Sequence, residues 1–125
     1  MTPDADDPAL EHPAPNPHAR TRTSGRFTVI EVAGEIDLAT AGFVAEHLDA
    51  ATARPLPDVL VDLRYVVFFD CSGLRVLCRA ETRAREREGR LRVVCDQPRI
   101  RRLFAGTGLL KRFPPLSGVP GEGRR

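Results

Sequence analysis

Apolar and polar positions follow two spacings along the chain, and together they predict alternating strands and helices. Residues 19–23 and 27–32 flank a Ser24-Gly25 turn and predict a hairpin whose first strand is polar and lies at a sheet edge. Residues 59–63 form an almost continuous apolar run rich in valine, which is typical of a central parallel strand covered on both faces. Residues 91–95 predict a further strand.

Between these strands, apolar residues recur at helical spacing. Val44, Leu48 and Ala51 mark the inner side of one such segment, and Leu74 and Leu77 mark that of the next. The predicted helices span residues 40–52, 73–88 and 98–106. The order of elements predicts the α/β class, with a single domain whose mixed β-sheet, an N-terminal hairpin plus parallel strands, is flanked by helices.

The two ends of the chain lack such periodicity. Residues 1–18 are rich in proline and are expected to form a disordered tail, which leaves residues 19–116 as the domain. Phe113 begins a weak edge strand that the following prolines cut short. Residues 117–125 contain mainly glycine, proline and arginine and are expected to form a flexible C-terminal tail.

Composition narrows the function classes. The chain has 125 residues, 42% of them hydrophobic, and a net charge of +2, which predicts one small domain and no general attraction to nucleic acid. No apolar run is long enough to span a membrane and no signal peptide is evident, so we expect a cytoplasmic protein. The three cysteines form no disulfide framework or C-x-x-C pair, which fits a reducing compartment.

Candidate chemistry gathers where the apolar residues 67–69, which are typical of the end of a buried strand, give way to a helix. Ser72 stands at this junction, where a serine oxygen can cap the helix by accepting an amide hydrogen bond. The same position suits a phosphate, because the helix dipole and the free N–H groups of the first turn stabilise added negative charge. The question is whether Ser72 only caps the helix or also acts as a switch.

Enzyme activity would need partners that the sequence does not supply. Cys71 or Ser72 could be a nucleophile, but the only candidate base in the folded part is His47, which we expect to be a partly exposed helix residue. No G-x-S-x-G elbow, phosphate-binding loop or zinc-ligand spacing occurs. We therefore predict no catalytic residue, no cofactor and no metal.

A receiver domain and a nucleic-acid-binding protein are both less well supported. Asp62 and Asp70 near strand ends raise the possibility of a receiver domain phosphorylated on aspartate, but Lys111 is the only lysine and no acidic cluster is evident to hold magnesium. Arginines at positions 75, 79, 83 and 87 form a stripe on one helix, which favours a solvated helix face over nucleic-acid binding because glutamates lie beside it. The stripe is also compatible with an acidic partner protein.

Three segments of the sequence resemble the STAS domain family, specifically the bacterial anti-sigma factor antagonists. Phe69-Asp70-Cys71-Ser72-Gly73-Leu74 is similar to the family signature D-S-S-G-L, although Cys71 replaces its first serine. Gly34-Glu35-Ile36-Asp37 with Thr40-Ala41 resembles the segment G-E-[LI]-D-x-x-[TS]-A, and residues 101–104 with 107–109 resemble the late helix and turn. Family members usually end in another amphipathic helix, which this chain lacks.

The resemblance implies a non-enzymatic switch. Such antagonists bind an anti-sigma factor serine kinase of the GHKL ATPase type and thereby free a sigma factor. The kinase phosphorylates the second serine of the signature, which dissociates the complex, and a PPM-type phosphatase reverses this. Carried over to this chain, the phosphorylation site is Ser72. The implied partner-binding residues are Asp37, Thr40, Asp70, Cys71 and Gly73, to which we add Arg75 and Arg79 from the arginine stripe. No direct contact with nucleic acid or membrane is expected.

Two hypotheses compete with this one. The domain could dock constitutively in a larger assembly, such as a stressosome-like or a lipid-transport complex, without being switched by phosphate. It could also be an enzyme that uses Cys71 or Ser72.

Overall fold

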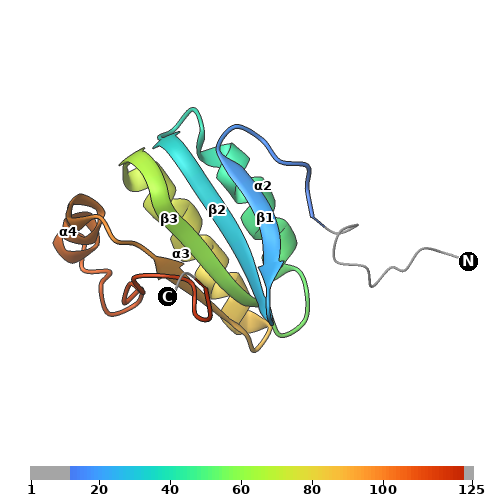
Figure 1. The fold of residues 1–125 in the computed structure, drawn as a ribbon. Helices are drawn as coiled ribbons and strands as arrows, with labels where there is room; N and C mark the ends of the chain where they lie inside the picture. Colours follow the sequence, from blue (N-terminus) through green and yellow to red (C-terminus); the bar gives the residue numbers. More distant parts are fainter. Residues whose placement is uncertain (1–11, 123–125) are drawn as a thin grey trace, which may run out of the picture.

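The computed structural model describes residues 12–122 and shows a mixed four-stranded sheet with helices on one face (Figure 1). The sheet order is β1-β2-β3-β4, where β1 and β2 are antiparallel and the other two neighbouring pairs are parallel. The strands and helices, in chain order, are β1 (Ala19–Ser24), β2 (Phe27–Ile36), α2 (Ala41–Thr52), β3 (Asp58–Phe69), α3 (Cys71–Glu86), β4 (Arg90–Val94) and α4 (Pro98–Gly106). The predicted fold class is confirmed.

The strands differ from the prediction mainly in length. β2 runs four residues further than expected, to Ile36, and β3 joins the predicted segments 59–63 and 67–69 into one strand that ends at Phe69. Their pairing continues to Ile36↔Phe69 despite register shifts after Glu31 and Gly34. The longer strands bring the β2–α2 loop and the start of α3 to the same edge, because parallel strands end on the same side of a sheet.

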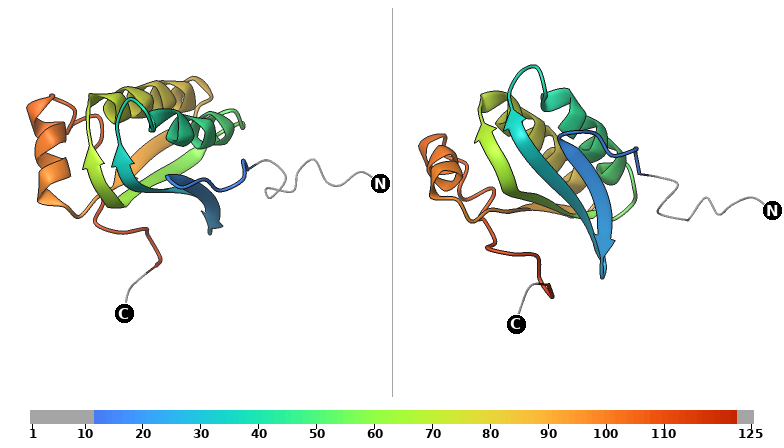
Figure 2. Two further views of the ribbon diagram at one scale, coloured as in Figure 1. Left: turned by 90° about the horizontal axis from the view of Figure 1, so that it is seen from above. Right: turned by 45° about the horizontal axis from the view of Figure 1, so that its top comes forward.

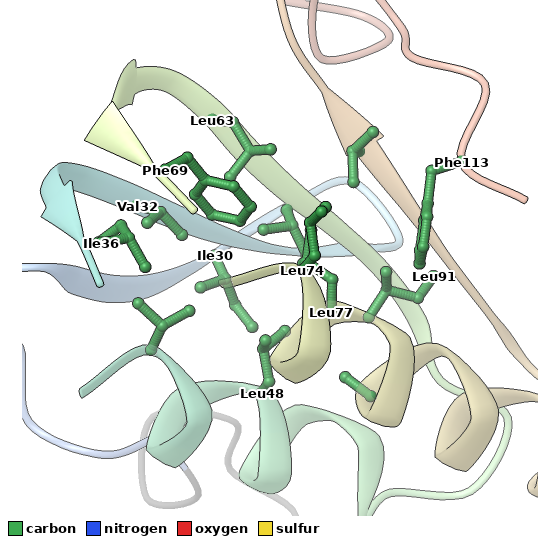
Figure 3. Close-up of a cluster of buried hydrophobic side chains, with 14 of the residues drawn as sticks. Ile30, Val32, Ile36, Leu48, Leu63, Phe69, Leu74, Leu77, Leu91 and Phe113 are labelled. Atoms are coloured by element: carbon green, nitrogen blue, oxygen red, sulfur yellow. The ribbon is translucent and has the colours of Figure 1, made fainter. Parts of the chain in front are cut away.

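The main core lies between the sheet and the two helices α2 and α3. Figure 2 (left) shows both helices on one side of the sheet. Valine, leucine and isoleucine side chains from alternate strand positions meet the apolar stripes of the helices there (Figure 3). Leu48 of α2 and Leu77 of α3 are almost completely buried in this layer. Burial on that scale contributes roughly 2 kcal/mol per leucine side chain.

The opposite face of the sheet is covered in part by the C-terminal segment. Val119 packs on Val29, Leu60 and Val94 and is 2% exposed. Figure 2 shows this segment running on the side of the sheet that α2 and α3 leave open. In place of the weak edge strand expected from Phe113, the chain makes only an isolated parallel bridge between Val94 and Leu116.

Beyond Val119, polar and charged side chains of β1 hold the C-terminal segment against the domain. Arg22 of β1 donates two hydrogen bonds to the Glu122 carboxylate, at 2.8 and 2.9 Å, and the Ser24 hydroxyl donates another. The hydrogen bonds from Arg22, followed by that from Ser24, lower the pKa of Glu122 to about 2. Residues 117–122 therefore pack against the domain, although we expected a flexible tail from residue 117.

Residues 12–18 also contact the domain. His18 stacks on Phe43 of α2, with ring centroids 5.7 Å apart, and its Nδ1 lies 3.1 Å from the Ala33 carbonyl oxygen. Gly34 has a φ of +83°, and a Cβ there would approach the His18 ring to 3.2 Å, so both backbone and space favour glycine. The part of the expected N-terminal tail before residue 12 lies outside the described residues.

Candidate functional site

Asp70 caps the first turn of α3, which corrects the expectation that Ser72 does so. Asp70 has an extended backbone, and its Oδ1 accepts a hydrogen bond of 2.8 Å from the Ser72 amide. Its own amide donates to the Ile36 carbonyl at 3.2 Å, which ties the cap to the end of β2. Helix α3 therefore begins two residues earlier than predicted, at Cys71.

Ser72 is the second residue of the helix and lies half-buried at its N-terminal end. Its amide is taken by Asp70, while its hydroxyl has no hydrogen-bond partner within residues 12–122. The neighbouring Cys71 is exposed. The Ser72 hydroxyl is thus not needed to hold the fold together, and it stands where a modifying group would meet both the helix dipole and the Asp70 carboxylate.

Gly73 provides the space that the start of α3 requires. A Cβ at this position would come within 2.6 to 2.9 Å of the Phe69 ring, which packs directly beneath the first turn. Gly73 is buried, unlike its neighbours Cys71 and Arg75. The signature glycine therefore fixes how closely the end of β3 and the start of α3 approach each other.

The β2–α2 loop beside this turn is held by Asp37 and Thr40. The Asp37 carboxylate accepts hydrogen bonds from the amides of Ala39 and Thr40, at 3.0 and 3.2 Å. The Thr40 hydroxyl donates to the Glu35 carbonyl at 2.7 Å and accepts from the Asp37 amide at 2.9 Å. The side chains of these two residues hydrogen-bond inside the loop and fix its conformation. If the loop contacts a partner, their role is to hold the loop backbone and its other side chains in place.

One of these side chains, Leu38, was not predicted from the sequence as part of the site. Leu38, at the tip of this loop, is 82% exposed. A large apolar side chain in that position contributes nothing to the core and is available to a partner. The signal in the sequence is that Leu38 fits neither the alternation of β2 nor the helical spacing of α2.

The arginine stripe of α3 divides into two parts. Arg75 and Arg79 are exposed, and Arg79 makes a long ion pair of 3.9 Å with Asp49 of α2. Arg83 is turned toward α2, where it donates to the Thr52 hydroxyl at 3.1 Å. Only the first part of the stripe lies near Ser72 in sequence and open to solvent, and its role in partner binding stays a prediction.

His47 is buried, which shows that its expected placement as a partly exposed residue is wrong. Its Nε2 lies 3.1 Å from the Ala14 carbonyl oxygen and its Nδ1 lies 2.6 Å from the Thr21 hydroxyl. Because a carbonyl can only accept, Nε2 donates and Nδ1 accepts from Thr21. Neither ring nitrogen is left to act as a base toward Cys71 or Ser72.

Other chemistry finds little support in the described part of the chain. Residues 12–122 contain no cluster of His, Cys, Asp and Glu side chains that could hold a metal ion. Burial raises the pKa of the Cys95 thiol, which disfavours its reactive thiolate form. Across the same residues, no helix has the length and apolar character that crossing a bilayer requires.

Comparison with known proteins adds a consistent set of similarities. The family model described as STAS domain matches residues 18–120. An anti-sigma-B factor antagonist from Listeria monocytogenes is 38% identical over 93 residues, which cover 74% of this chain and 81% of that protein.

Solved structures agree at the level of the fold. An anti-sigma factor antagonist from Mycobacterium paratuberculosis superposes with a TM-score of 0.72 at 28% identity, covering 81% of this chain and 86% of that one. The phosphorylated form of the Bacillus cell fate determinant SpoIIAA superposes with a TM-score of 0.63 at 18% identity, covering 83% and 93%.

Proposed function

Since the chain belongs to the STAS domain family, we propose that it is an anti-sigma factor antagonist whose partner binding is switched by phosphorylation of Ser72. The observation that carries the proposal is the setting of Ser72: a hydroxyl with no hydrogen-bond partner within residues 12–122, in the first turn of a helix, beside a hydrogen-bonded loop with an exposed leucine. The partner is an anti-sigma factor serine kinase of the GHKL ATPase type. A PPM-type phosphatase removes the phosphate.

Phosphate at Ser72 acts through local charge. It adds about −1.5 to −2 charges at neutral pH. Asp70 Oδ1 is already 2.8 Å from the Ser72 amide, so the phosphate joins a carboxylate in the same helical turn. The helix dipole stabilises this excess charge in the free domain, where water also reaches it. A partner packed over the turn would have to remove that water, which favours dissociation.

The unmodified surface offers the partner both apolar and charged contacts. Leu38 supplies an exposed apolar side chain on the β2–α2 loop. Arg75 and Arg79 supply positive charge on the second and third turns of α3. Cys71 lies next to Ser72 and is exposed, so it belongs to the same surface. In this scheme Asp37, Thr40 and Asp70 position the surface, and Gly73 keeps α3 close to β3.

The phosphorylation step is tested with the purified protein, ATP and an anti-sigma factor kinase from the same genome. Intact mass spectrometry should show addition of one phosphate, and Ser72→Ala should abolish it. Ser117→Ala is the matched control, because Ser117 is exposed but lies on the C-terminal segment, and it should be phosphorylated like the original protein. Labelling that persists in Ser72→Ala would refute the assignment.

The switch itself is tested by kinase binding in isothermal titration. Ser72→Glu should weaken binding by about a hundredfold or more, the range found when a charge is buried without a partner. Ser72→Ala should bind about as tightly as the original protein. Equal binding of Ser72→Glu would instead support a module that docks constitutively.

A further inference from the structure

β3 extends beyond its neighbour β4, and α4 fills the space that a longer β4 would occupy. The β3–β4 pairing ends at Asp62↔Val94, whereas β3 continues to Phe69. Figure 1 shows α4 beside this end of β3, where β4 no longer pairs with it. The Gln97 side chain donates to the carbonyls of Arg64 and Val66, at 3.1 and 2.8 Å. Side chains from the start of α4 thus replace part of the missing strand.

This replacement is incomplete and leaves a hollow. A cavity of about 330 Å³ lies between the end of β3 and α4, open to solvent and lined by Phe68, Phe69, Arg99, Ile100, Arg102 and Leu103. Phe68 is 50% exposed, and Val67 next to it is 59% exposed. The hollow therefore has an apolar floor that is partly open to solvent at Phe68, with space for a few aliphatic side chains.

The rim of this hollow is positively charged. Helix α4 contains Arg99, Arg101 and Arg102 and no acidic residue, although the exposed Asp96 precedes it. Arg99 donates to the Val67 carbonyl at 2.8 Å and Arg101 to the Cys95 carbonyl at 3.4 Å, and both of these acceptors are neutral groups.

Several arginines elsewhere are neutralised by carboxylates of the domain. Arg22, Arg64, Arg85 and Arg112 each form an ion pair with a carboxylate at 2.9 Å or less. For Arg102, no ion pair is found with any residue from 12 to 122. The positive charge around the hollow is therefore left for a carboxylate from outside the chain.

We propose that this hollow is the docking site for a short amphipathic segment of a partner protein, with aliphatic side chains that enter the cavity and flanking carboxylates that meet Arg99 and Arg102. The apolar floor is the reason to expect aliphatic side chains in the partner segment. The guanidinium groups that no carboxylate of the domain neutralises are the reason to expect acidic residues beside them. Ser72 does not line the hollow, although Phe69, which packs beneath the first turn of α3, does. Binding here continues when Ser72 carries a phosphate.

A synthetic peptide tests the proposal directly. The probe is a peptide of about 16 residues, long enough to form a helix, with leucine along one side and glutamate on the other. A second peptide has lysine in place of each glutamate. Titration into the isotope-labelled protein, followed by NMR, should shift the amide signals of Phe68, Phe69 and α4 with the glutamate peptide only.

Two variants locate the interaction. Arg102→Glu should weaken binding of the glutamate peptide by about fivefold or more, as expected for reversing one exposed charge contact. Arg87→Glu, which reverses an exposed arginine at the far end of α3, should leave the affinity within about twofold. Ser72→Glu should also leave it unchanged, and this result separates the docking site from the phosphorylation switch.

Several outcomes would overturn the proposal. Equal binding of the lysine peptide would show that charge does not select the ligand. Equal weakening by Arg87→Glu would show attraction to the whole molecule and not to this hollow. Absence of signal shifts up to about 1 mM peptide, or displacement of the peptide by a short DNA duplex, would likewise exclude an acidic protein segment as the favoured ligand.

Discussion

Because Asp70 and not Ser72 caps α3, alanine substitutions at these two positions should affect stability differently. Asp70→Ala removes the carboxylate that accepts the Ser72 amide at 2.8 Å, and with it the negative charge at the N-terminus of α3. Loss of a capping side chain costs about 1 kcal/mol, with a range of roughly 0.5–2. Ser72→Ala removes a hydroxyl that makes no hydrogen bond within residues 12–122 and adds a better helix former, so the unfolding free energy should change by less than about 0.5 kcal/mol.

Urea unfolding followed by circular dichroism measures both effects. With a dependence of about 1–3 kcal/mol per molar urea, the Asp70→Ala midpoint should fall by roughly 0.5 M, and the Ser72→Ala midpoint should stay in place or rise slightly. Asp70→Asn is the matched control, because asparagine also caps helices but carries no charge. It should recover most of the loss. A larger loss of stability in Ser72→Ala than in Asp70→Ala would refute the cap assignment.

Three further predictions address the packing and charge around the site. Gly73→Ala should destabilise the fold by about 1–2 kcal/mol, since overpacking against Phe69 outweighs the gain in helix propensity. In a double-mutant cycle measured by thermal unfolding, adding Phe69→Leu should remove most of that cost. The pKa of Glu122 is lowered to about 2 in the folded protein, so its pairing with Arg22 stabilises the fold at pH values above the unfolded pKa near 4.5. This stabilisation is lost as the pH falls toward about 2. Glu122→Gln should therefore remove this part of the acid dependence of the unfolding free energy, measured by unfolding titrations at several pH values. His47→Ala should cost about 2–4 kcal/mol in urea unfolding, because it leaves a cavity and removes two part-buried hydrogen bonds. An unchanged midpoint would contradict the role of the buried ring in stabilising the fold.

The parts of the fold that follow periodic patterns were predictable from the sequence. The hairpin, the valine-rich central strand and the three helices each place apolar residues at the spacing of their element, so the pattern alone identifies them. The continuity of β3 from residue 59 to residue 69 was not predicted, because Arg64 and Tyr65 interrupt the apolar run. Pairing with β2 keeps this part of the strand extended, and pairing partners are not visible in a local pattern.

The details of the site depended on geometry that the sequence leaves open. Asp70 and Ser72 are both good capping residues, and only the extended backbone at Asp70 decides between them. His47 lies next to the apolar stripe of α2, and its burial depends on Thr21 and Ala14, which are distant in sequence. Val119 is a single apolar residue among glycine and proline, so no pattern predicts that it covers the sheet.

That covering segment has a consequence for how the protein is made. The contact between Arg22 and Glu122 joins residues 100 positions apart, and Val119 reaches back to Val29 and Leu60. Synthesis proceeds at roughly 5–20 residues per second, and domains begin to fold from the N-terminal side as they emerge. Until residue 119 has left the ribosome, Val29, Leu60 and Val94 on the second face of the sheet lack the cover that Val119 gives them. A nascent chain stalled shortly before that point should therefore bind apolar-recognising chaperones that the finished domain does not.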